Sequence, residues 1–445
     1  MKKVLILGAG LVANPMVQYF LSKGYKITIA SNTPERGLSM IGGHPNGTNV
    51  NWSVEELVKL DEMIKSHDLV VSLLPYTYHV TVAEYAIKRK KNMVTTSYVK
   101  PEMQALHNKA KRAGIIILNE IGLDPGIDHM SAMRIIDNIH NQDGRVKEFW
   151  SICGALPAPE CANNPLKYKF SWSPKGVVLA GNNDASYLHK GQVVEVPTQD
   201  LFKNPRKLSF PEVGDLEFYP NRDSISYIDI YGLKGVETIF RGTFRFKGWC
   251  DAIDMMKQLK LFSIETIDMK DMTYADLMAK QIGEETSDNI LEKTAAYLVI
   301  EKDTPALQAI AWLGLFDETQ MNRRVDSTFE VTSDLMISKM NLGETERDMI
   351  VMRHTFLAEY PDGKNEVIHS SMLDFGSPST DTSIARTVAL PAAIAAEMIL
   401  EGKINLKGVF RPVLPEIYNP VLDRLESMNI KMVEEYGLPL NKNIQ

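Results

Sequence analysis

The sequence contains 445 residues, of which 44% are hydrophobic and 24% are charged. These proportions are those of ordinary globular proteins, so they exclude collagen-like, coiled-coil and mostly disordered chains, and the length predicts two or three domains. The net charge of -7 gives the chain no basic field that would attract nucleic acid or an anionic membrane. An anionic ligand would therefore need a local basic pocket.

Cysteine usage and hydrophobic runs bear on the cell compartment. The chain has three cysteines, which are too few for a disulfide framework and lack the close spacing of a zinc site: Cys153, Cys161 and Cys250. We therefore expect a reducing cytoplasm and no metal. The apolar residues up to Ala13 imitate a secretory signal, but glycines interrupt them, and no other uncharged apolar run is long enough to predict a membrane span.

From Lys3 to about Glu120, short apolar runs alternate with amphipathic segments. This alternation predicts a parallel sheet covered by helices. The predicted strands are Val4 to Leu7, Lys26 to Ala30, Asp68 to Leu74, Asn92 to Thr96 and Ile115 to Leu118. The predicted helices are Val54 to Lys65, His79 to Lys90 and Pro101 to Ala113.

After Asp124-Pro125-Gly126 the pattern changes to longer β-like stretches, which favour a mixed or antiparallel sheet. These stretches are Val146 to Cys153, Lys169 to Leu179, Ser226 to Tyr231 and Glu237 to Phe246. From about Asp251 to Arg353 the abundance of Met, Leu, Lys and Glu predicts a helical subdomain. Further on, we predict a hairpin over Thr355 to Phe375 with its turn at Pro361-Asp362-Gly363, and a helix over Ser383 to Glu401 that ends at Gly402.

The residues after the first predicted strand form a G-x-G-x-x-A motif that opens a helix: Gly8, Ala9, Gly10, Leu11, Val12 and Ala13. This is a dinucleotide-binding fingerprint in its required context. Gly8 allows a tight turn, Gly10 lets a pyrophosphate approach the backbone, and Ala13 keeps the helix close to the strand. The helix start then offers free N–H groups to the phosphates.

The motif and the alternation together predict an α/β fold: a Rossmann-type, doubly wound parallel sheet, a second mixed α+β sheet domain and a helical insert. Residues 1–128 would form the dinucleotide-binding domain, completed by residues 383–445. Residues 129–250 and 354–382 would form the sheet domain, and residues 251–353 the helical subdomain.

The end of the second predicted strand indicates which dinucleotide binds. It carries Ser31, Asn32 and Thr33, with Arg36 close behind, where an NAD-binding domain normally has a carboxylate for the ribose 2'-hydroxyl. Hydroxyl, amide and guanidinium donors suit a 2'-phosphate, so we favour NADP(H) over NAD(H). Glu35 leaves the alternative open, because it could take the acidic role while Arg36 is a solvated loop charge.

The ends of the third and fourth predicted strands should face the same crevice. They carry Leu74-Pro75-Tyr76 and Thr95-Thr96-Ser97-Tyr98. We expect the nicotinamide and the substrate to meet there, although the two threonines could equally reflect β-propensity alone.

Six segments, in order along nearly the whole chain, resemble the NADP-dependent, glutamate-forming saccharopine dehydrogenase family. They are Glu120 to His129, Cys153 to Glu160, Lys169 to Ser173, Tyr219 to Ser224, Arg241 to Arg245 and Ala389 to Ala393. The resemblance implies that glutamate and 2-aminoadipate 6-semialdehyde form an imine, which NADPH reduces to saccharopine, or the reverse reaction of lysine metabolism. It also implies three domains, of which the middle one binds substrate and forms a homodimer.

The resemblance also implies site residues. The amino-acid ligand would contact Ser97, Tyr98, Leu123, Asp124, Arg222, Thr243, Phe244 and Arg245. The cofactor would be lined by Leu11, Val12, Ala13, Ser31, Asn32, Thr33, Leu74, Thr95 and Thr96.

The chemistry of the substrate agrees with these roles, because saccharopine carries three carboxylates and an acidic protein must supply cations locally. Arg222 and Arg245 can each do so as a bidentate fork, although a surface ion pair is the plain alternative for either. Asp124 could stabilise an iminium cation, and Tyr98 could hydrogen bond or transfer a proton to the carbinolamine oxygen. Cys153 could line the site. The alternatives are that Asp124 only forms a turn, that Tyr98 is a core residue and that Cys153 is a small buried residue.

Three other functions fit parts of the pattern. A related imine reductase of the carboxynorspermidine dehydrogenase type would act on a diamine and would need acids where this chain has arginines. A non-catalytic NADP-binding regulatory protein would keep the fold without the chemistry. A cysteine hydrolase using Cys153, His129 and Asp124 would leave the nucleotide motif unused. The residues do not indicate the physiological direction of the reaction.

Overall fold

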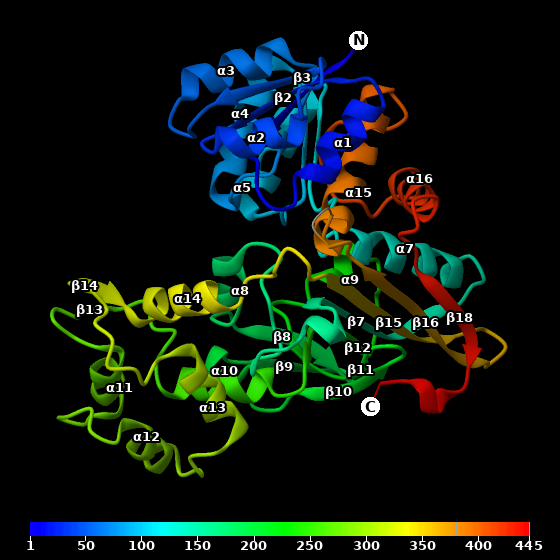
Figure 1. The fold of residues 1–445 in the computed structure, drawn as a ribbon. Coiled ribbons are helices and arrows are strands. Elements are labelled where there is room, and N and C mark those ends of the chain that lie inside the picture. Colours follow the sequence, from blue (N-terminus) through cyan, green and yellow to red (C-terminus); the bar gives the residue numbers. More distant parts are fainter. Residues whose placement is uncertain (379–380, 445) are drawn as a thin grey trace. The chain divides into compact units, whose positions relative to one another are not determined.

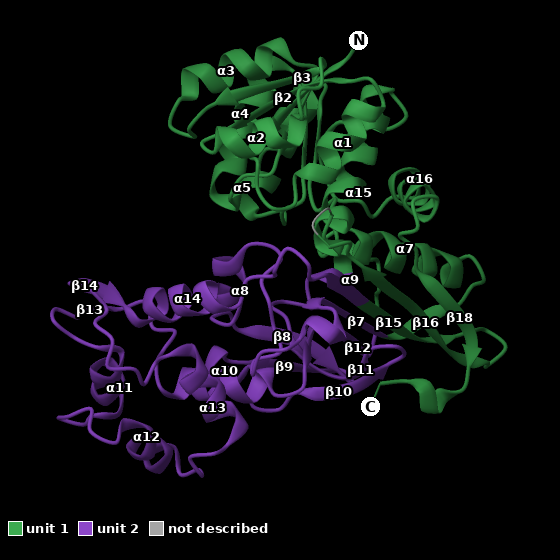
Figure 2. Ribbon diagram, in the orientation of Figure 1, with its two compact units in different colours: residues 1–148, 229–234, 352–445 green, residues 149–228, 235–351 purple. Residues whose placement is uncertain are grey.

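The computed structural model describes residues 1–378 and 381–444. The chain divides into two compact units, shown in Figure 2. Unit 1 comprises residues 1–148, 229–234 and 352–445, and unit 2 comprises residues 149–228 and 235–351. The three-domain division expected from the sequence stays a prediction.

Unit 1 contains a seven-stranded sheet in the order β17-β6-β5-β4-β1-β2-β3, and every pair of neighbouring strands is parallel. The strands are β1 (Lys3–Leu7), β2 (Lys26–Ser31), β3 (Gly47–Asn51), β4 (Leu69–Ser72), β5 (Asn92–Thr95), β6 (Ile116–Leu118) and β17 (Gly408–Phe410). The strand order reverses between β1 and β4, which is the switch point where doubly wound sheets bind dinucleotides. The predicted Rossmann-type sheet is therefore confirmed.

Helices cover both faces of this sheet, which is why its central strands β1 and β4 are continuous apolar runs rather than alternating ones. The helices are α1 (Asn14–Ser22), α2 (Pro34–Ile41), α3 (Leu57–Ser66), α4 (His79–Arg89), α5 (Pro101–Gln104), α6 (His107–Ala113) and α15 (Ser383–Leu400). Helix α15 lies beside α1 and packs against β4 and β5 (Figure 1). It is long and apolar enough to cross a membrane, but 83% of its apolar window is buried, as in a core helix.

The remainder of unit 1 follows the sheet in the sequence or comes from the C-terminal part of the chain. Helix α7 (Ile127–His140) packs against α16 (Pro415–Glu426). Strand β16 (Asn365–Phe375) pairs antiparallel with β18 (Val433–Leu438). The predicted hairpin turn before β16 is confirmed, because the Tyr360 N–H donates to the Lys364 carbonyl over 2.9 Å.

Unit 2 contains antiparallel strands and most of the helical insert. Strand β11 (Gly214–Pro220) pairs with β10 (Arg206–Phe210) and β12 (Thr238–Phe246), and β8 (Ala185–His189) pairs with β12 and β9 (Gln192–Val196). The helices are α8 (Pro174–Ala180), α10 (Trp249–Gln258), α11 (Tyr274–Ile282), α12 (Ile290–Leu298), α13 (Pro305–Leu313) and α14 (Thr328–Lys339). Strands β13 (Thr266–Asp268) and β14 (Val325–Ser327) form a separate two-stranded sheet.

Three elements contribute residues to both units: β7 (Arg145–Pro157), α9 (Tyr227–Ile230) and β15 (Asp348–Glu359).

Several local predictions are wrong. The stretch Lys169 to Leu179 contains helix α8 instead of a strand, because Pro174 occupies a helix start. Ser226 to Tyr231 contains the short helix α9. The predicted helix over Pro101 to Ala113 is two helices, α5 and α6, separated at Ala105 and Leu106.

Candidate functional site

The turn after β1 has the geometry that a dinucleotide requires. Gly8 has a φ of +104°, which suits glycine, and a Cβ there would lie 3.1 Å from the Leu73 carbonyl oxygen. At Gly10 no atom lies within 4 Å of the position of a Cβ, so the backbone is open to a ligand. The N–H groups of Leu11 and Val12 donate to no group in residues 1–378 and 381–444. They precede α1, so free donors and the positive end of a helix meet at this turn.

The end of β2 presents polar donors to the same edge of the sheet. Ser31 Oγ lies 2.8 Å from Thr33 Oγ1 and accepts from the Thr33 N–H over 2.9 Å. Asn32 and Arg36 are exposed, and no carboxylate of the described residues forms an ion pair with Arg36. Glu35 is exposed on the same helix start. Hydroxyl, amide and guanidinium groups are therefore available for a phosphate.

A buried histidine joins the ends of β4 and β5. His79 Nδ1 lies 2.9 Å from Ser72 Oγ, and its Nε2 lies 2.7 Å from Ser97 Oγ and 3.3 Å from Thr95 Oγ1. Burial lowers the pKa of His79 to about 4, so the ring is neutral near pH 7 and has one donor and one acceptor nitrogen. His79 therefore orients the hydroxyl of Ser97. Leu74 lies after β4 and packs against the apolar core of the sheet, and the half-buried Thr96 follows β5.

Tyr98 and Asp124 are hydrogen bonded to each other. The Tyr98 hydroxyl donates to Asp124 Oδ1 over 2.9 Å, and both side chains are half-buried. The loop that carries Asp124 contains a cis bond to Pro125, and hydrogen bonds among its own residues close it. The Gly126 N–H donates to Asp128 Oδ1 over 2.6 Å, and the Asp128 N–H donates to the carbonyl of the buried Leu123 over 3.0 Å. The pair thus combines a fixed carboxylate with a phenolic proton.

In unit 2, Arg245 on β12 is a buried cation surrounded by aromatic rings. Arg245 is only 5% exposed. Its guanidinium carbon lies 5.0 Å from the centre of the Tyr168 ring and 5.4 Å from the centre of the Trp249 ring. Glu217 is its cross-strand neighbour, but Glu217 Oε1 accepts from the Cys250 N–H over 2.7 Å. No carboxylate of the described residues pairs with Arg245, and its Nε has no partner. A buried guanidinium with unused donors is suited to an anionic ligand.

The other predicted residues of unit 2 lie near this arginine or at the surface. Thr243 is half-buried on β12 and hydrogen bonds with Tyr219, which also hydrogen bonds with Arg245. Phe244 is fully buried and its carbonyl accepts from Arg245 Nη1 over 2.9 Å.

Arg222 is exposed, with a φ of +55°, and its carbonyl accepts from the Ser186 N–H over 2.9 Å. Cys153 on β7 is buried, as are the other two cysteines, and all three are free thiols.

The structure brings the predicted residues together in two sets, one in each unit. In unit 1 the predicted cofactor residues lie at the carboxyl edge of one sheet, on the glycine turn and at the ends of β2, β4 and β5. The loops after β5 and β6 bring four predicted substrate residues to the same edge: Ser97, Tyr98, Leu123 and Asp124. In unit 2 Thr243, Phe244 and Arg245 are consecutive on β12. Sequence reasoning missed His79 as a contact of Ser97. A histidine at the start of the helix after β4 was the signal that could have revealed it.

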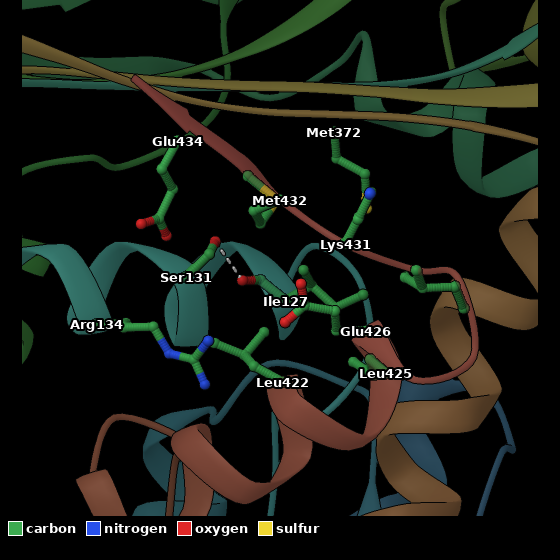
Figure 3. Close-up of a pocket in the computed structure, with 11 residues that line it drawn as sticks. Ile127, Ser131, Arg134, Met372, Leu422, Leu425, Glu426, Lys431, Met432 and Glu434 are labelled. Atoms are coloured by element: carbon green, nitrogen blue, oxygen red, sulfur yellow. Dashed lines mark hydrogen bonds between the residues drawn. The ribbon is translucent and has the colours of Figure 1, made fainter. Parts of the chain in front are cut away.

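A separate pocket in unit 1 contains none of the predicted site residues (Figure 3). It lies among α7, α16 and β18, and Arg134, Leu422, Lys431 and Glu434 are among the residues that line it. Arg134 donates to Asp423 over 2.7 Å, so its charge is already paired. Among the residues with described positions, no group of three or more His, Cys, Asp or Glu side chains could hold a metal ion.

The fold and the two sets of residues define a class: a dinucleotide-binding protein of the oxidoreductase type whose second unit offers a buried cation. Comparison with known proteins identifies the family. The model of the saccharopine dehydrogenase NADP binding domain matches residues 4–118, and that of the saccharopine dehydrogenase C-terminal domain matches residues 122–430. The chain belongs to the saccharopine dehydrogenase family, as its resemblance indicated.

Known proteins match over nearly the whole of this chain. The chain is 35% identical to saccharopine dehydrogenase [NADP(+), L-glutamate-forming] of Pyricularia oryzae, over 100% of this chain and 99% of that protein. It is 38% identical to the mitochondrial alpha-aminoadipic semialdehyde synthase of Rattus norvegicus, over 96% of this chain and 47% of that protein. The solved structure of apo saccharopine dehydrogenase (L-Glu forming) from Saccharomyces cerevisiae matches with a TM-score of 0.89 and 32% identity, over 98% of this chain and all of that one. The predicted recognition and fold class are confirmed.

Proposed function

We propose that this protein is an NADP-dependent saccharopine dehydrogenase of the glutamate-forming type. It would reduce the imine of glutamate and 2-aminoadipate 6-semialdehyde to saccharopine, or run the reverse reaction. The observation that carries the proposal is the identity of 35% to a glutamate-forming enzyme over the whole of both chains. Because the likeness covers both units, it extends to the substrate-binding half as well as to the nucleotide fold.

Unit 1 fits the cofactor. The open backbone at Gly10 and the free N–H groups of Leu11 and Val12 would bind the pyrophosphate, and Ser31, Asn32, Thr33 and Arg36 would bind the ribose 2'-phosphate. We therefore propose that NADP(H) is preferred over NAD(H), and the unpaired guanidinium of Arg36 supports this preference. Bound NADPH supplies the hydride.

The carboxylates of the amino-acid substrate would be bound by Arg245 and Arg222. Arg245 has a buried guanidinium whose Nε lacks a partner, so a carboxylate would satisfy donors that the protein leaves open. Thr243 adds a hydroxyl beside it on β12. These interactions would orient the substrate and exclude water from it.

Tyr98 and Asp124 would serve the reacting carbon and nitrogen. The Asp124 carboxylate accepts from the Tyr98 hydroxyl in the structure, which supports a role as an anion that stabilises a developing iminium cation. The Tyr98 Oη proton would then assist loss or addition of the carbinolamine oxygen. Ser97, oriented by His79, would bind the amino-acid ligand, and Cys153 would line the site.

The test is the initial rate of NADPH oxidation by the purified protein with 2-aminoadipate 6-semialdehyde. Glutamate is compared with diaminopropane as the amine, and NADH is run in parallel. Glutamate-dependent oxidation that prefers NADPH is the expected result. Turnover with diaminopropane alone would indicate an imine reductase of the carboxynorspermidine dehydrogenase type, and NADPH binding without any turnover would indicate a regulatory protein.

We also propose that the protein is a cytoplasmic homodimer. Its three cysteines are free and buried, which is consistent with a reducing compartment. Light scattering of the purified protein would give the mass of the assembly, and a single-chain mass of 50.0 kDa would contradict the dimer. Imaging of a tagged protein would test the compartment.

A further inference from the structure

We propose that Glu120 is a positioning residue for the Tyr98–Asp124 pair. The proposal rests on the proposed function, because it assigns Glu120 to the same reaction. Glu120 lies two residues after the end of β6, in the loop that leads to Asp124, and it was not among the residues expected to touch cofactor or substrate. Its carboxylate is buried where it cannot reach solvent, with a side chain that is 2% exposed.

One oxygen of this carboxylate holds the loop that carries Tyr98. Glu120 Oε1 accepts from the backbone N–H of Val99, the residue after Tyr98, over 2.7 Å. The same loop is held a second time by the Glu120 backbone, whose N–H donates to the Ser97 carbonyl over 3.2 Å. Glu120 thus fixes the backbone on both sides of Tyr98.

The other oxygen holds the helix that follows Asp124. Glu120 Oε2 lies 2.9 Å from Nε2 of His129, which is in the first turn of α7. His129 is fully buried, and its Nδ1 lies 2.5 Å from the Tyr231 hydroxyl. Because Asp124 sits between Glu120 and His129 in the chain, this contact closes the loop that carries Asp124 onto its own helix.

Hydrogen bonds and a cation together keep the buried carboxylate ionised. Arg411, which follows β17, donates through Nε to Glu120 Oε1 over 2.8 Å. Burial alone would raise the pKa of Glu120, but its hydrogen bonds with His129 and Val99 and the charge of Arg411 hold that pKa below its ordinary value. Glu120 therefore accepts hydrogen bonds at both oxygens and ties together the ends of β5, β6 and β17.

We infer that this arrangement fixes the distance between the Tyr98 hydroxyl and the Asp124 carboxylate. The Tyr98 hydroxyl and Asp124 lie on separate loops, and their contact of 2.9 Å depends on how those loops are placed. A displacement of about 1 Å in a reacting group can cost on the order of a hundredfold in rate. Glu120 contacts the backbone of the Tyr98 loop and the side chain of His129 beyond the Asp124 loop, and it is not itself assigned to the ligand.

The experiment compares Glu120→Ala with Glu120→Gln, Tyr98→Phe and the Glu120→Ala/Tyr98→Phe double variant. Glu120→Ala should lower kcat on the order of a hundredfold and change KM for NADPH by less than about twofold. Glu120→Gln should recover at least about a tenth of the wild-type kcat, because its amide oxygen can still accept from Val99. If Glu120 acts through Tyr98, adding Glu120→Ala to Tyr98→Phe should lower kcat by less than about threefold. Losses that multiply in the double variant would overturn the proposal.

Hydrogen exchange of the ligand-free protein provides a measurement that does not depend on turnover. In Glu120→Ala the Val99 amide should exchange at least about tenfold faster than in wild type. Glu102→Ala, an exposed glutamate at the start of α5, is the matched control and should leave this exchange unchanged. Unchanged exchange in Glu120→Ala would overturn the positioning role. If the exchange is altered in Glu120→Ala but wild type does not oxidise NADPH with glutamate and 2-aminoadipate 6-semialdehyde, only the proposed function is overturned.

Discussion

His79 gives a prediction about stability whose size follows from its surroundings. The ring is buried and hydrogen bonded between Ser72 and Ser97, and its pKa falls to about 4 from an ordinary value of 6.5. Replacing it in His79→Gln removes the titrating group while keeping an amide that can donate and accept. The difference in unfolding free energy between wild type and variant should therefore depend on pH.

The sign follows from proton uptake. Above about pH 6.5 the ring is neutral in both the folded and the unfolded chain, so the full contribution of His79 is present. As the pH falls from there towards about 4, the unfolded chain binds a proton that the folded chain does not, and stability is lost. The interval between the two pKa values corresponds to a loss of roughly 3 kcal/mol.

Urea unfolding followed by tryptophan fluorescence measures this loss. The unfolding free energy of wild type should fall more steeply between about pH 7 and pH 4 than that of His79→Gln, because all other titrating groups cancel in the comparison. His140→Gln, which removes an exposed histidine of α7, is the control and should follow the wild type. Parallel pH dependences for wild type and His79→Gln would refute the reasoning.

Four further predictions concern residues assigned to the ligands or to the lining of the site. Arg36→Ala should lower the ratio of kcat/KM for NADPH to that for NADH at least about tenfold, because a 2'-phosphate loses its guanidinium, and an unchanged ratio would contradict the assigned role. Arg245→Lys should raise KM for glutamate at least about tenfold in steady-state assays with little change in KM for NADPH, because a planar fork becomes a point charge. Equal weakening of both ligands would indicate a structural arginine. The same comparison of the two KM values applies to Arg222→Ala. Cys153→Ala should keep kcat within about threefold of wild type, and a complete loss of turnover would show that the thiol is needed for chemistry.

The nucleotide-binding fold was predictable because its signals are local. The apolar runs and the glycine motif identified β1, β2, β4, β5 and β6 to within two residues, together with helix α1. Strand β3 was missed because Gly47 to Asn51 is polar and pairs at the edge of the sheet, where burial is partial. The two wrong strands, at Lys169 to Leu179 and Ser226 to Tyr231, show that apolar periodicity over a few residues does not separate a strand from a short helix.

The site was predictable to the extent that each residue has a motif of its own. The fingerprint and the family segments named the residues that would face ligands, but they could not show that His79 contacts Ser97 or that Glu120 contacts Val99. Those contacts join side chains on different loops, and their partners depend on the sheet order rather than on spacing in the sequence. Similarly, the resemblance named Arg245, whereas its aromatic surroundings from Tyr168 and Trp249 become evident only in the folded chain.

The position of β17 has a consequence for biosynthesis. Gly408 of β17 pairs with Ile116 of β6, so the seventh strand of the nucleotide-binding sheet is made long after the other six. A nascent chain that has emerged only as far as β6 leaves that strand edge unpaired and lacks α15, which covers β4 and β5. The same would hold for a fragment cut between residues 118 and 122, where the two family models meet, and we expect such a fragment to aggregate in sedimentation experiments. The two halves that sequence comparison separates therefore share one sheet, and we expect that the first half does not fold independently.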